Sequence, residues 1–213
     1  MEATFCYADL AGFTALTEAH GNEVAADVAV RFVEMVDECL GDGDRLFKTV
    51  GDAVLVACAG PDAGVVFVSK LFEVVGAEPS YPRLRAGLHH GTAAVRGEEV
   101  FGEGVNLAAR VAAEARASQV LATQAIAAAA VRSGIEATKL GDFTLRNIAR
   151  PVTIFDLDVR ATEGDRVEDP VCRMEVERDR APARLRYHHV DYHFCSLECA
   201  GDFARAPERY AFG

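Results

Sequence analysis

The chain has 213 residues, of which 50% are hydrophobic and 26% charged, so it can bury a core and is neither a disordered nor a fibrous protein. No apolar run approaches the roughly 20 residues that span a bilayer, and the first residues, MEATFCYADL, lack a signal-peptide pattern. We therefore expect a cytoplasmic protein with no membrane partner. The net charge of −11 argues against a nucleic-acid partner, because binding to phosphate backbones depends on basic surfaces, but it permits a nucleotide held through metal ions.

Strand and helix patterns alternate through the first part of the chain. In order, we expect a strand at 3–9, a helix from about 14 to 40, strands at 45–50 and 53–59, a helix at 62–75 and a strand at 83–90. The two middle strands flank Gly51-Asp52, which is a tight hairpin signal. The order β-α-β-β-α-β predicts an α+β fold with a ferredoxin-like core.

Further elements extend this core. We expect a helix near 104–117, a strand at 119–123, an alanine-rich helix at 124–133 and a closing pair of strands around 143–147 and 152–159. The alanine-rich pattern then gives way to RATEGDRVEDP, a polar stretch that ends in proline. We therefore expect a domain at 1–160, a linker at 161–167 and a small cysteine-rich α+β domain at 168–213.

The six cysteines fall into two groups. Three lie singly within apolar stretches and are predicted to be small buried side chains: Cys6, Cys39 and Cys58. The other three gather near the end of the chain, close to three of the six histidines: Cys172, Cys195 and Cys199. In a reducing cytosol, thiols at such spacing bind metal more often than they form disulfides.

A pair of aspartates is predicted to meet at one edge of the sheet. Asp9 ends the first strand, and Asp52 lies in the hairpin just before the third. These two strands are neighbours and antiparallel in a ferredoxin-like unit, so the two carboxylates come together. Such a pair repels itself unless a hard divalent cation, which prefers oxygen ligands, lies between them. Taken singly, Asp52 could be a turn residue and Asp9 a helix cap, but the pair favours a metal site.

The surrounding residues suit a nucleotide. Asp9 leads through a small-residue turn to Phe13 and Thr14, at the start of a helix whose backbone N–H groups can face phosphates. Later in the chain, FGEGVNLAARV places Asn106 and Arg110 four residues apart on one helix face. An amide and a guanidinium aimed together suit a ribose and a transferring phosphoryl group, although Arg110 could also be a solvated helix residue.

Together, YADLAGFT, FKTVGDAVLVA, GLHHG and FGEGVNLAARV resemble the catalytic domain of the class III adenylate and guanylate cyclases, over roughly residues 3–158. The resemblance implies a head-to-tail homodimer with active sites at the subunit interface. It also implies a reaction in which ATP becomes cyclic AMP and pyrophosphate with the help of two Mg²⁺ or Mn²⁺ ions per site. One ion lowers the pKa of the ribose 3′-hydroxyl, and the other holds the phosphates.

The same resemblance assigns roles to individual residues. Asp9 and Asp52 match the two metal-binding aspartates of the family, with the Leu10 carbonyl as a further possible ligand. Asn106 and Arg110 match the residues that orient the ribose and stabilise the transition state. Arg146 stands where the family usually has a lysine that binds the terminal phosphates.

The base-recognising residues favour ATP. Lys48 matches the lysine that recognises adenine, and as a donor it suits adenine N1, whereas guanine presents an N–H at that place. Glu99 stands where ATP-using cyclases commonly carry aspartate or threonine, and its carboxylate could accept a hydrogen bond from the adenine amine. We therefore expect an adenylate cyclase, with a guanylate cyclase as the near alternative.

The last 45 residues are expected to need a bound metal or another cross-link, because so short a segment rarely forms a stable core unaided. DPVCRM, YHFCSLEC and PERY resemble the YHS domain, a small metal-binding module. The resemblance implies a transition-metal site, zinc or copper(I), built from Cys172, Cys195 and Cys199. His193 is the nearest candidate for a fourth ligand. The module could be purely structural, or its metal could modulate the cyclase.

A second class of function stays open from the sequence. The chain could use the cyclase fold only to form dimers and the cysteine module to bind or sense metal. Such a non-catalytic protein would bind nucleotide without forming a cyclic product.

Overall fold

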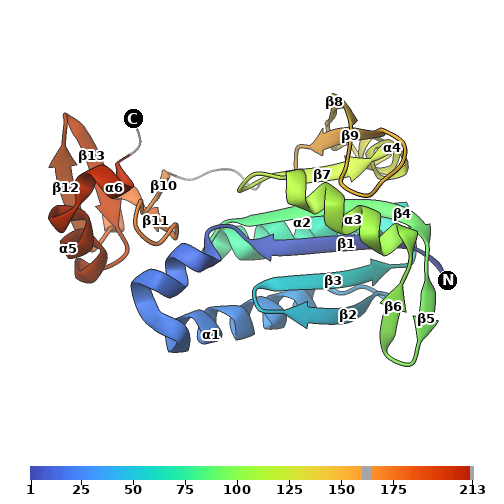
Figure 1. Cartoon of the computed structure of the whole chain (residues 1–213), viewed down its shortest axis with the longest axis horizontal. Coiled ribbons are helices and arrows are strands. Elements are labelled where there is room, and N and C mark those ends of the chain that lie inside the picture. Colours follow the sequence, from blue (N-terminus) through green and yellow to red (C-terminus); the bar gives the residue numbers. More distant parts are fainter. Residues whose placement is uncertain (160–164, 212–213) are drawn as a thin grey trace.

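The structure is a computed structural model that describes residues 1–159 and 165–211. The predicted linker at 161–167 therefore lies largely outside the described residues, and the boundaries of the two domains stay a prediction. On either side of this gap lie a large sheet with helices on both faces and a small C-terminal unit (Figure 1).

The order of elements agrees with the sequence expectation. The elements before the gap are β1 (Glu2–Leu10), α1 (Phe13–Cys39), β2 (Arg45–Val50), β3 (Ala53–Cys58), α2 (Pro61–Ala77), β4 (Leu84–Thr92), β5 (Ala94–Arg96), β6 (Glu99–Phe101), α3 (Glu103–Glu114), β7 (Val120–Thr123), α4 (Gln124–Arg132), β8 (Ala137–Phe143) and β9 (Val152–Leu157). The sheet has the strand order β2-β3-β1-β4-β7-β9-β8, and its first four strands have the ferredoxin-like order. The predicted α+β fold is confirmed.

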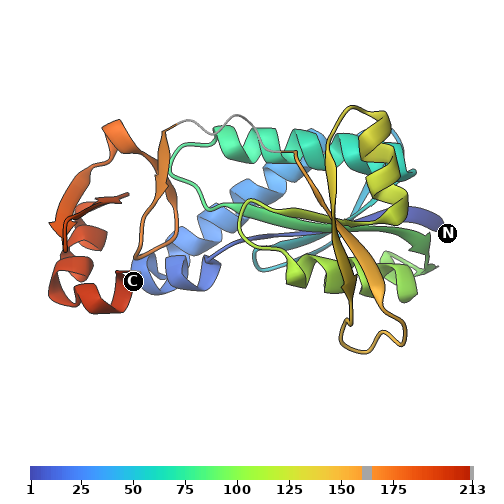
Figure 2. The same cartoon turned by 90° about the horizontal axis from the view of Figure 1, so that it is seen from above.

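Helices cover the two faces of the sheet unequally. The apolar faces of α1, α2 and α4 pack on one face, and α3 packs alone on the other, as Figure 2 shows. Cys6, Cys39 and Cys58 are buried in this core, as predicted for small apolar side chains. The helix α3 lies against β4 at Gly87, where no side chain separates the two backbones.

The long helix α1 carries a kink near its start. Its apolar stripe is buried along most of its length, but Gly21 has φ 83° and ψ 172°, a backbone conformation that is nearly exclusive to glycine. The first segment of the helix, residues 13–20, therefore runs in a different direction from the rest. This segment reaches beyond the sheet to the C-terminal unit (Figure 1).

Two details differ from the expected elements. The strand expected at 143–147 lies earlier, as β8, and Leu145 and Arg146 belong to the loop that follows it. A short hairpin, β5–β6, was not predicted, since three-residue strands leave little periodicity to read. This hairpin carries Glu99 opposite Arg96.

The C-terminal unit is built from short elements. They are β10 (Arg166–Glu168), β11 (Glu175–Glu177), a 3-10 helix (Arg178–Arg180), β12 (Ala183–Tyr187), β13 (Val190–Phe194), α5 (Leu197–Arg205) and α6 (Pro207–Tyr210). The antiparallel pair β12–β13 packs against α5, and the second antiparallel pair, β10–β11, lies next to β13 (Figure 1). The small α+β character expected for this part of the chain is confirmed.

The C-terminal unit shares a core with the start of α1. Leu16 of α1 is fully buried, in one apolar cluster with Cys172, Phe194 and Phe203. At the edge of this cluster the Arg83 Nε donates to the Glu175 carboxylate at 2.7 Å. The two parts of the chain therefore pack as one body around residues 13–20.

Candidate functional site

The two aspartates that were predicted to bind metal lie close together, where β1 ends and β3 begins. Antiparallel register places Asp9 opposite Ala53, the residue after Asp52, and also opposite Arg85 on the other neighbouring strand. Arg85 binds the Asp9 carboxylate with two nitrogens, Nε at 2.5 Å and Nη2 at 2.8 Å. This geometry is a two-point ion pair, and it fixes the orientation of Asp9.

The carboxylate of Asp52 is held in an environment that disfavours its charge. Burial is the main cause that raises the pKa of Asp52, and the neighbouring charge of Asp9 raises it further. Hydrogen bonds from the backbone N–H groups of Asp52 and Leu10, together with the charge of Arg85, act in the opposite direction. Two carboxylates and a nearby main-chain segment at Leu10 form an oxygen-rich donor set of the kind that Mg²⁺ and Mn²⁺ prefer. The residues present therefore fit the expected cations.

The turn after Asp9 leads into the start of α1. Gly12 caps the helix with φ 81°, and no side chain among the described residues caps its first turn. A Cβ on Gly12 would lie 2.5 Å from the Cβ of Arg173, so the turn touches the C-terminal unit. Thr14 is exposed, and Phe13 packs between the two apolar clusters.

The other predicted nucleotide-binding residues lie elsewhere on the surface. Lys48 is exposed on β2, Glu99 on β6 and Arg146 in the loop after β8. Asn106 and Arg110 lie one turn apart on α3, Asn106 exposed and Arg110 half-buried. In the part of the chain that the structure describes, no hydrogen bond or ion pair joins any of these five side chains to Asp9 or Asp52. One chain alone therefore brings together only the metal-binding part of the predicted site.

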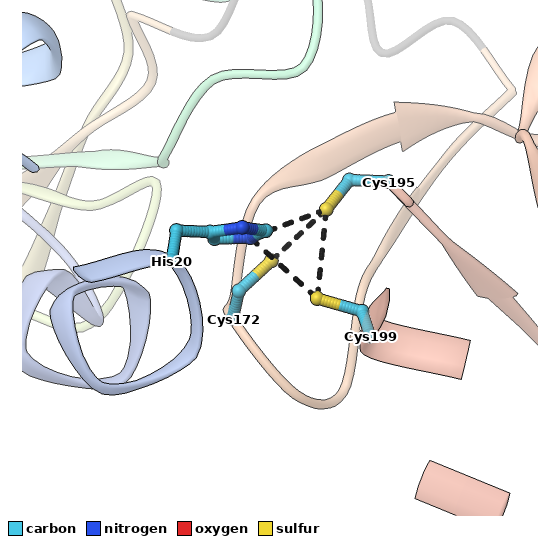
Figure 3. Close-up of side chains that lie close together, drawn as sticks. All are labelled: His20, Cys172, Cys195 and Cys199. Atoms are coloured by element: carbon cyan, nitrogen blue, oxygen red, sulfur yellow. Dashed lines mark hydrogen bonds between the residues drawn. The ribbon is translucent and has the colours of Figure 1, made fainter. Parts of the chain in front are cut away.

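A second constellation gathers the three C-terminal cysteines around a histidine. The sulfur of Cys195 lies 3.4 Å from that of Cys172 and 3.7 Å from that of Cys199. The Nε2 atom of His20 lies 3.5 Å from the sulfurs of Cys195 and Cys199 (Figure 3). All four possible ligand atoms lie within 4.8 Å of one another.

The structure corrects the expected fourth ligand. His193 stands opposite Arg184 in the β12–β13 hairpin, is 4% exposed and does not belong to the cysteine cluster. Burial lowers the pKa of His193, and Arg178 and Arg184 add to this effect. The place beside the sulfurs is taken by His20, which is distant in sequence but close in space.

The three thiols shift one another's pKa through hydrogen bonds. Hydrogen bonds from Cys172 and Cys195 lower the pKa of Cys199, whereas hydrogen bonding with Cys195 and Cys199 raises the pKa of Cys172. One thiolate is thus favoured within the group, and burial opposes a second. A bound cation removes this restriction, because thiolates are the metal-binding form of cysteine.

Asp169 holds the two cysteine-bearing loops in place. Its carboxylate is fully buried and accepts hydrogen bonds from the backbone N–H groups of Val171 and Cys195, each at 2.8 Å. The Ser196 hydroxyl similarly accepts from the backbone N–H of Cys199 at 3.1 Å, at the start of α5. Cys172, Cys195 and Cys199 are therefore positioned by backbone contacts that need no metal.

We expect the substitution Asp169→Asn to destabilise the C-terminal unit by roughly 2 kcal/mol, within the range found for a buried polar group left without its partner. The amide offers one acceptor oxygen, so its NH₂ group would face one of the two backbone N–H donors. Thermal unfolding of the full chain would report the loss. Asp179→Asn, at an exposed position of the same unit, is the matched control and should leave unfolding unchanged. Equal unfolding temperatures for the two variants would contradict this role of Asp169.

Two side chains of these sites were not foreseen from the sequence. Arg85 could have been found from topology, since the fourth strand of a ferredoxin-like unit flanks the first and so brings a residue opposite Asp9. His20 gave a weaker signal: it is the only histidine before residue 89, and a glycine that breaks the helix follows it. Its contact with the cysteines depends on the packing of two distant parts of the chain.

Among the described residues, none of the helices has both the length and the apolar character needed to cross a bilayer.

Comparisons with known proteins agree with both parts of the chain. Residues 1–157 match the family model of the adenylate and guanylate cyclase catalytic domain, and residues 167–213 match that of the YHS domain. A pH-sensitive adenylate cyclase of Mycobacterium tuberculosis is 34% identical over 76% of this chain and 42% of its own length. An adenylate cyclase of Streptomyces coelicolor is 34% identical over 60% of this chain and 34% of its own. The chain thus spans less than half the length of these relatives.

Solved structures show the same fold. An adenylate cyclase from Trypanosoma brucei, in its monomeric state, aligns with a TM-score of 0.68 at 24% identity, covering 76% of this chain and 90% of that one. The adenylyl cyclase CyaB from P. aeruginosa aligns with a TM-score of 0.61 at 21% identity, covering 76% and 97%. By its sheet, its paired aspartates and these matches, the chain belongs to the family of adenylate and guanylate cyclase catalytic domains, and it carries a YHS domain at its C-terminal end.

Proposed function

We propose that the chain is an adenylate cyclase that converts ATP to cyclic AMP and pyrophosphate. The observation that carries this proposal is the meeting of Asp9 and Asp52 at one sheet edge, where burial and mutual repulsion raise the pKa of Asp52. Carboxylates kept together in this way gain most from divalent cations. Sequence similarity to two proteins named as adenylate cyclases also supports this proposal.

Each side chain at this edge has a part in the proposed reaction. Bound Mg²⁺ or Mn²⁺ would supply Lewis-acid activation of the 3′-hydroxyl and a clamp on the phosphates. Asp9 and Asp52 hold the cations, with the Leu10 carbonyl as a third oxygen donor. Arg85 fixes the orientation of Asp9 through its two-point contact. The first turn of α1, in which Thr14 is exposed and Phe13 is partly buried, offers backbone N–H groups to the phosphate oxygens.

A second copy of the chain completes the proposed site. Asn106 and Arg110 project from α3 and are not bound to the aspartates of their own chain. In a head-to-tail homodimer, they reach the aspartate pair of the partner, where Asn106 orients the ribose and Arg110 meets the charge that develops on the transferring phosphoryl group. Arg146 would bind the terminal phosphates, since guanidinium groups pair well with phosphate oxygens.

Base selection is assigned to two exposed residues. Lys48 donates to adenine N1, and Glu99 accepts from the adenine amine. Glu99 lies in a short hairpin opposite Arg96, so its position depends on a segment of only two three-residue strands.

The C-terminal unit is proposed to bind a transition metal through Cys172, Cys195 and Cys199, and thereby to modulate the cyclase. The C-terminal unit packs against residues 13–20, which follow the turn after Asp9. This packing supports a mechanical connection between the C-terminal unit and the aspartate pair. Equal turnover by the wild-type chain and by a Cys172→Ser variant, at saturating Mn²⁺, would contradict the modulation and leave a structural role.

The test of the proposed function is product formation by the purified chain with ATP or GTP and Mn²⁺, with the oligomeric state measured on the same sample. Formation of cyclic AMP from ATP in preference to cyclic GMP from GTP is the expected result. No cyclic product from either nucleotide, given a protein that is dimeric and binds nucleotide, would contradict the proposal and favour a binding module without catalysis.

A further inference from the structure

The histidine that meets the three cysteines comes from the other part of the chain. Cys172, Cys195 and Cys199 belong to the C-terminal unit, and His20 belongs to α1 of the cyclase domain (Figure 3). We propose that these four residues form one zinc site, to which the cyclase domain contributes His20, so that the bound metal joins the two domains.

The distances fit a tetrahedral ion. For Zn–S bonds of about 2.3 Å and a Zn–N bond of about 2.05 Å, tetrahedral geometry requires about 3.8 Å between sulfurs and about 3.6 Å between sulfur and nitrogen. Four of the six atom pairs lie at 3.4, 3.7, 3.5 and 3.5 Å, and all six lie within 4.8 Å. Sulfurs at 3.4 Å are far from the roughly 2.05 Å of a disulfide bond. The four atoms are therefore spaced as a set of ligands and not as a bonded pair.

The donor set selects the metal. Three thiolates and one imidazole make the closed four-ligand set typical of structural zinc sites, which leaves no open position for a substrate. Thiolates bind both Cu⁺ and Zn²⁺, but a tetrahedral set of three cysteines and one histidine is a standard structural zinc set. His20 thus favours zinc over copper(I), a choice that the cysteines by themselves leave open.

The start of α1 is built to present His20. Phe13, Leu16 and His20 are spaced by three and four residues, so they share one face of the helix. Leu16 on this face is fully buried against the C-terminal unit. The kink at Gly21 then turns the rest of the helix back toward the sheet, and no other atom lies within 4 Å of where a Cβ on Gly21 would be. The kink is therefore a property of the backbone, and it allows one helix to serve both domains.

The contact around the site is extensive even without the metal. Arg83 binds both Glu175 and Glu168 of the C-terminal unit, at 2.7 and 3.5 Å. The backbone N–H of Glu175 also donates to the Tyr81 carbonyl at 3.0 Å. These contacts fix the position of the C-terminal unit relative to the cyclase domain. His20 therefore lies near the sulfurs before any metal binds. A zinc ion at this place would then be bonded to His20 of the cyclase domain and to the three cysteines of the C-terminal unit.

The first test is zinc affinity of the full chain. The reduced, metal-free protein is titrated with Zn²⁺ against a chromophoric chelator, with Mg²⁺ in excess to occupy the carboxylates. We expect His20→Ala to weaken zinc binding by about 100-fold or more, beyond the effect of losing a residue that only orients a ligand. His193→Gln, within the C-terminal unit, should bind zinc as the wild type does. Unchanged affinity in His20→Ala, or a loss confined to His193→Gln, would overturn the proposal.

A second readout covers the case in which His20→Ala perturbs folding. With Co²⁺ in place of Zn²⁺, sulfur-to-metal charge-transfer absorption grows with the number of bound thiolates. The variant His20→Cys should raise this absorption above that of the wild type, from three thiolates to four. Identical spectra for the two proteins would show that residue 20 is not a ligand.

A third readout addresses the joining of the domains. Zinc should slow the hydrogen exchange of backbone amides in residues 13–20 of the wild type, because these residues are then tied to the C-terminal unit. In His20→Ala, zinc bound by the cysteines alone should leave that exchange unchanged. Protection of 13–20 by zinc in both proteins would show that the metal acts without His20, and the proposed join would fail.

Discussion

Asp52→Asn is expected to lower the rate of cyclic AMP formation by about 10³-fold, the effect of losing several kcal/mol of metal-dependent stabilisation of the transition state. The variant keeps the shape of the side chain and removes one of the two anionic oxygen donors at the sheet edge. Turnover is measured at saturating ATP and over a range of Mn²⁺ concentrations. Asp42→Asn, in the exposed loop before β2, is the matched control and should retain full activity.

The same variant should not be less stable than the wild type when metal is absent. Because the pKa of Asp52 is raised in the fold, its charged form opposes folding at neutral pH, and the neutral amide removes this opposition. The metal-free wild type should gain stability as the pH falls from neutrality through the raised pKa of Asp52, and Asp52→Asn should lack that contribution. A strongly destabilised variant would mean that its lost activity reports on folding, and full activity in a stable variant would contradict the two-metal account.

Gly87→Ala is expected to destabilise the cyclase domain more than an alanine at any other glycine of this domain, because its added Cβ makes the shortest contact. A Cβ at position 87 would lie 2.0 Å from the backbone nitrogen of Ala112 and 2.5 Å from its Cα. Overpacking of a core typically costs about 1–3 kcal/mol, and here the neighbour is backbone that cannot rotate away, so about 3 kcal/mol or more is expected. For a chain of this size that is a fall of about 10 °C in Tm.

The functional effect of Gly87→Ala follows from the helix that it displaces. The helix α3 carries Asn106 and Arg110, and pushing it off β4 would move both residues out of the positions that the proposed dimer requires. We expect a fall in turnover that persists at temperatures where the variant is fully folded. Gly60→Ala is the matched control, since its backbone is extended and no atom lies within 4 Å of the added Cβ. Unaltered stability of Gly87→Ala would contradict the close packing of α3 on β4.

Local patterns in the sequence were sufficient to predict most of the fold. The helix expected at 14–40 lies at Phe13–Cys39, and the hairpin at Gly51-Asp52 places Asp52 next to Asp9 as the topology requires. These predictions succeed because periodicity and turn residues act within a few positions of each other. The β8 strand was misplaced because its alternation is interrupted at Leu140, where the register with β9 shifts between Lys139 and Gly141.

Contacts between distant segments escaped prediction. The ion pair of Arg85 with Asp9 joins two strands, and the approach of His20 to Cys195 joins two domains. Choosing His193 by proximity in sequence failed because the hairpin that carries it holds its side chain opposite Arg184 and away from the sulfurs. Proximity in sequence is a poor guide to a ligand when a helix from another domain can supply it.

The buried Leu16 has a consequence for how separable the catalytic part of the chain is. Phe13, Leu16 and Ala19 pack against the C-terminal unit, in a cluster that also holds Val171 and Phe203. A chain that stopped at residue 160 would leave this apolar face exposed to water, next to the turn that follows Asp9. Exposed apolar surface of this kind promotes association with other protein molecules. The catalytic fold therefore has its own sheet and core, but the apolar face at the start of its first helix is covered by the C-terminal unit.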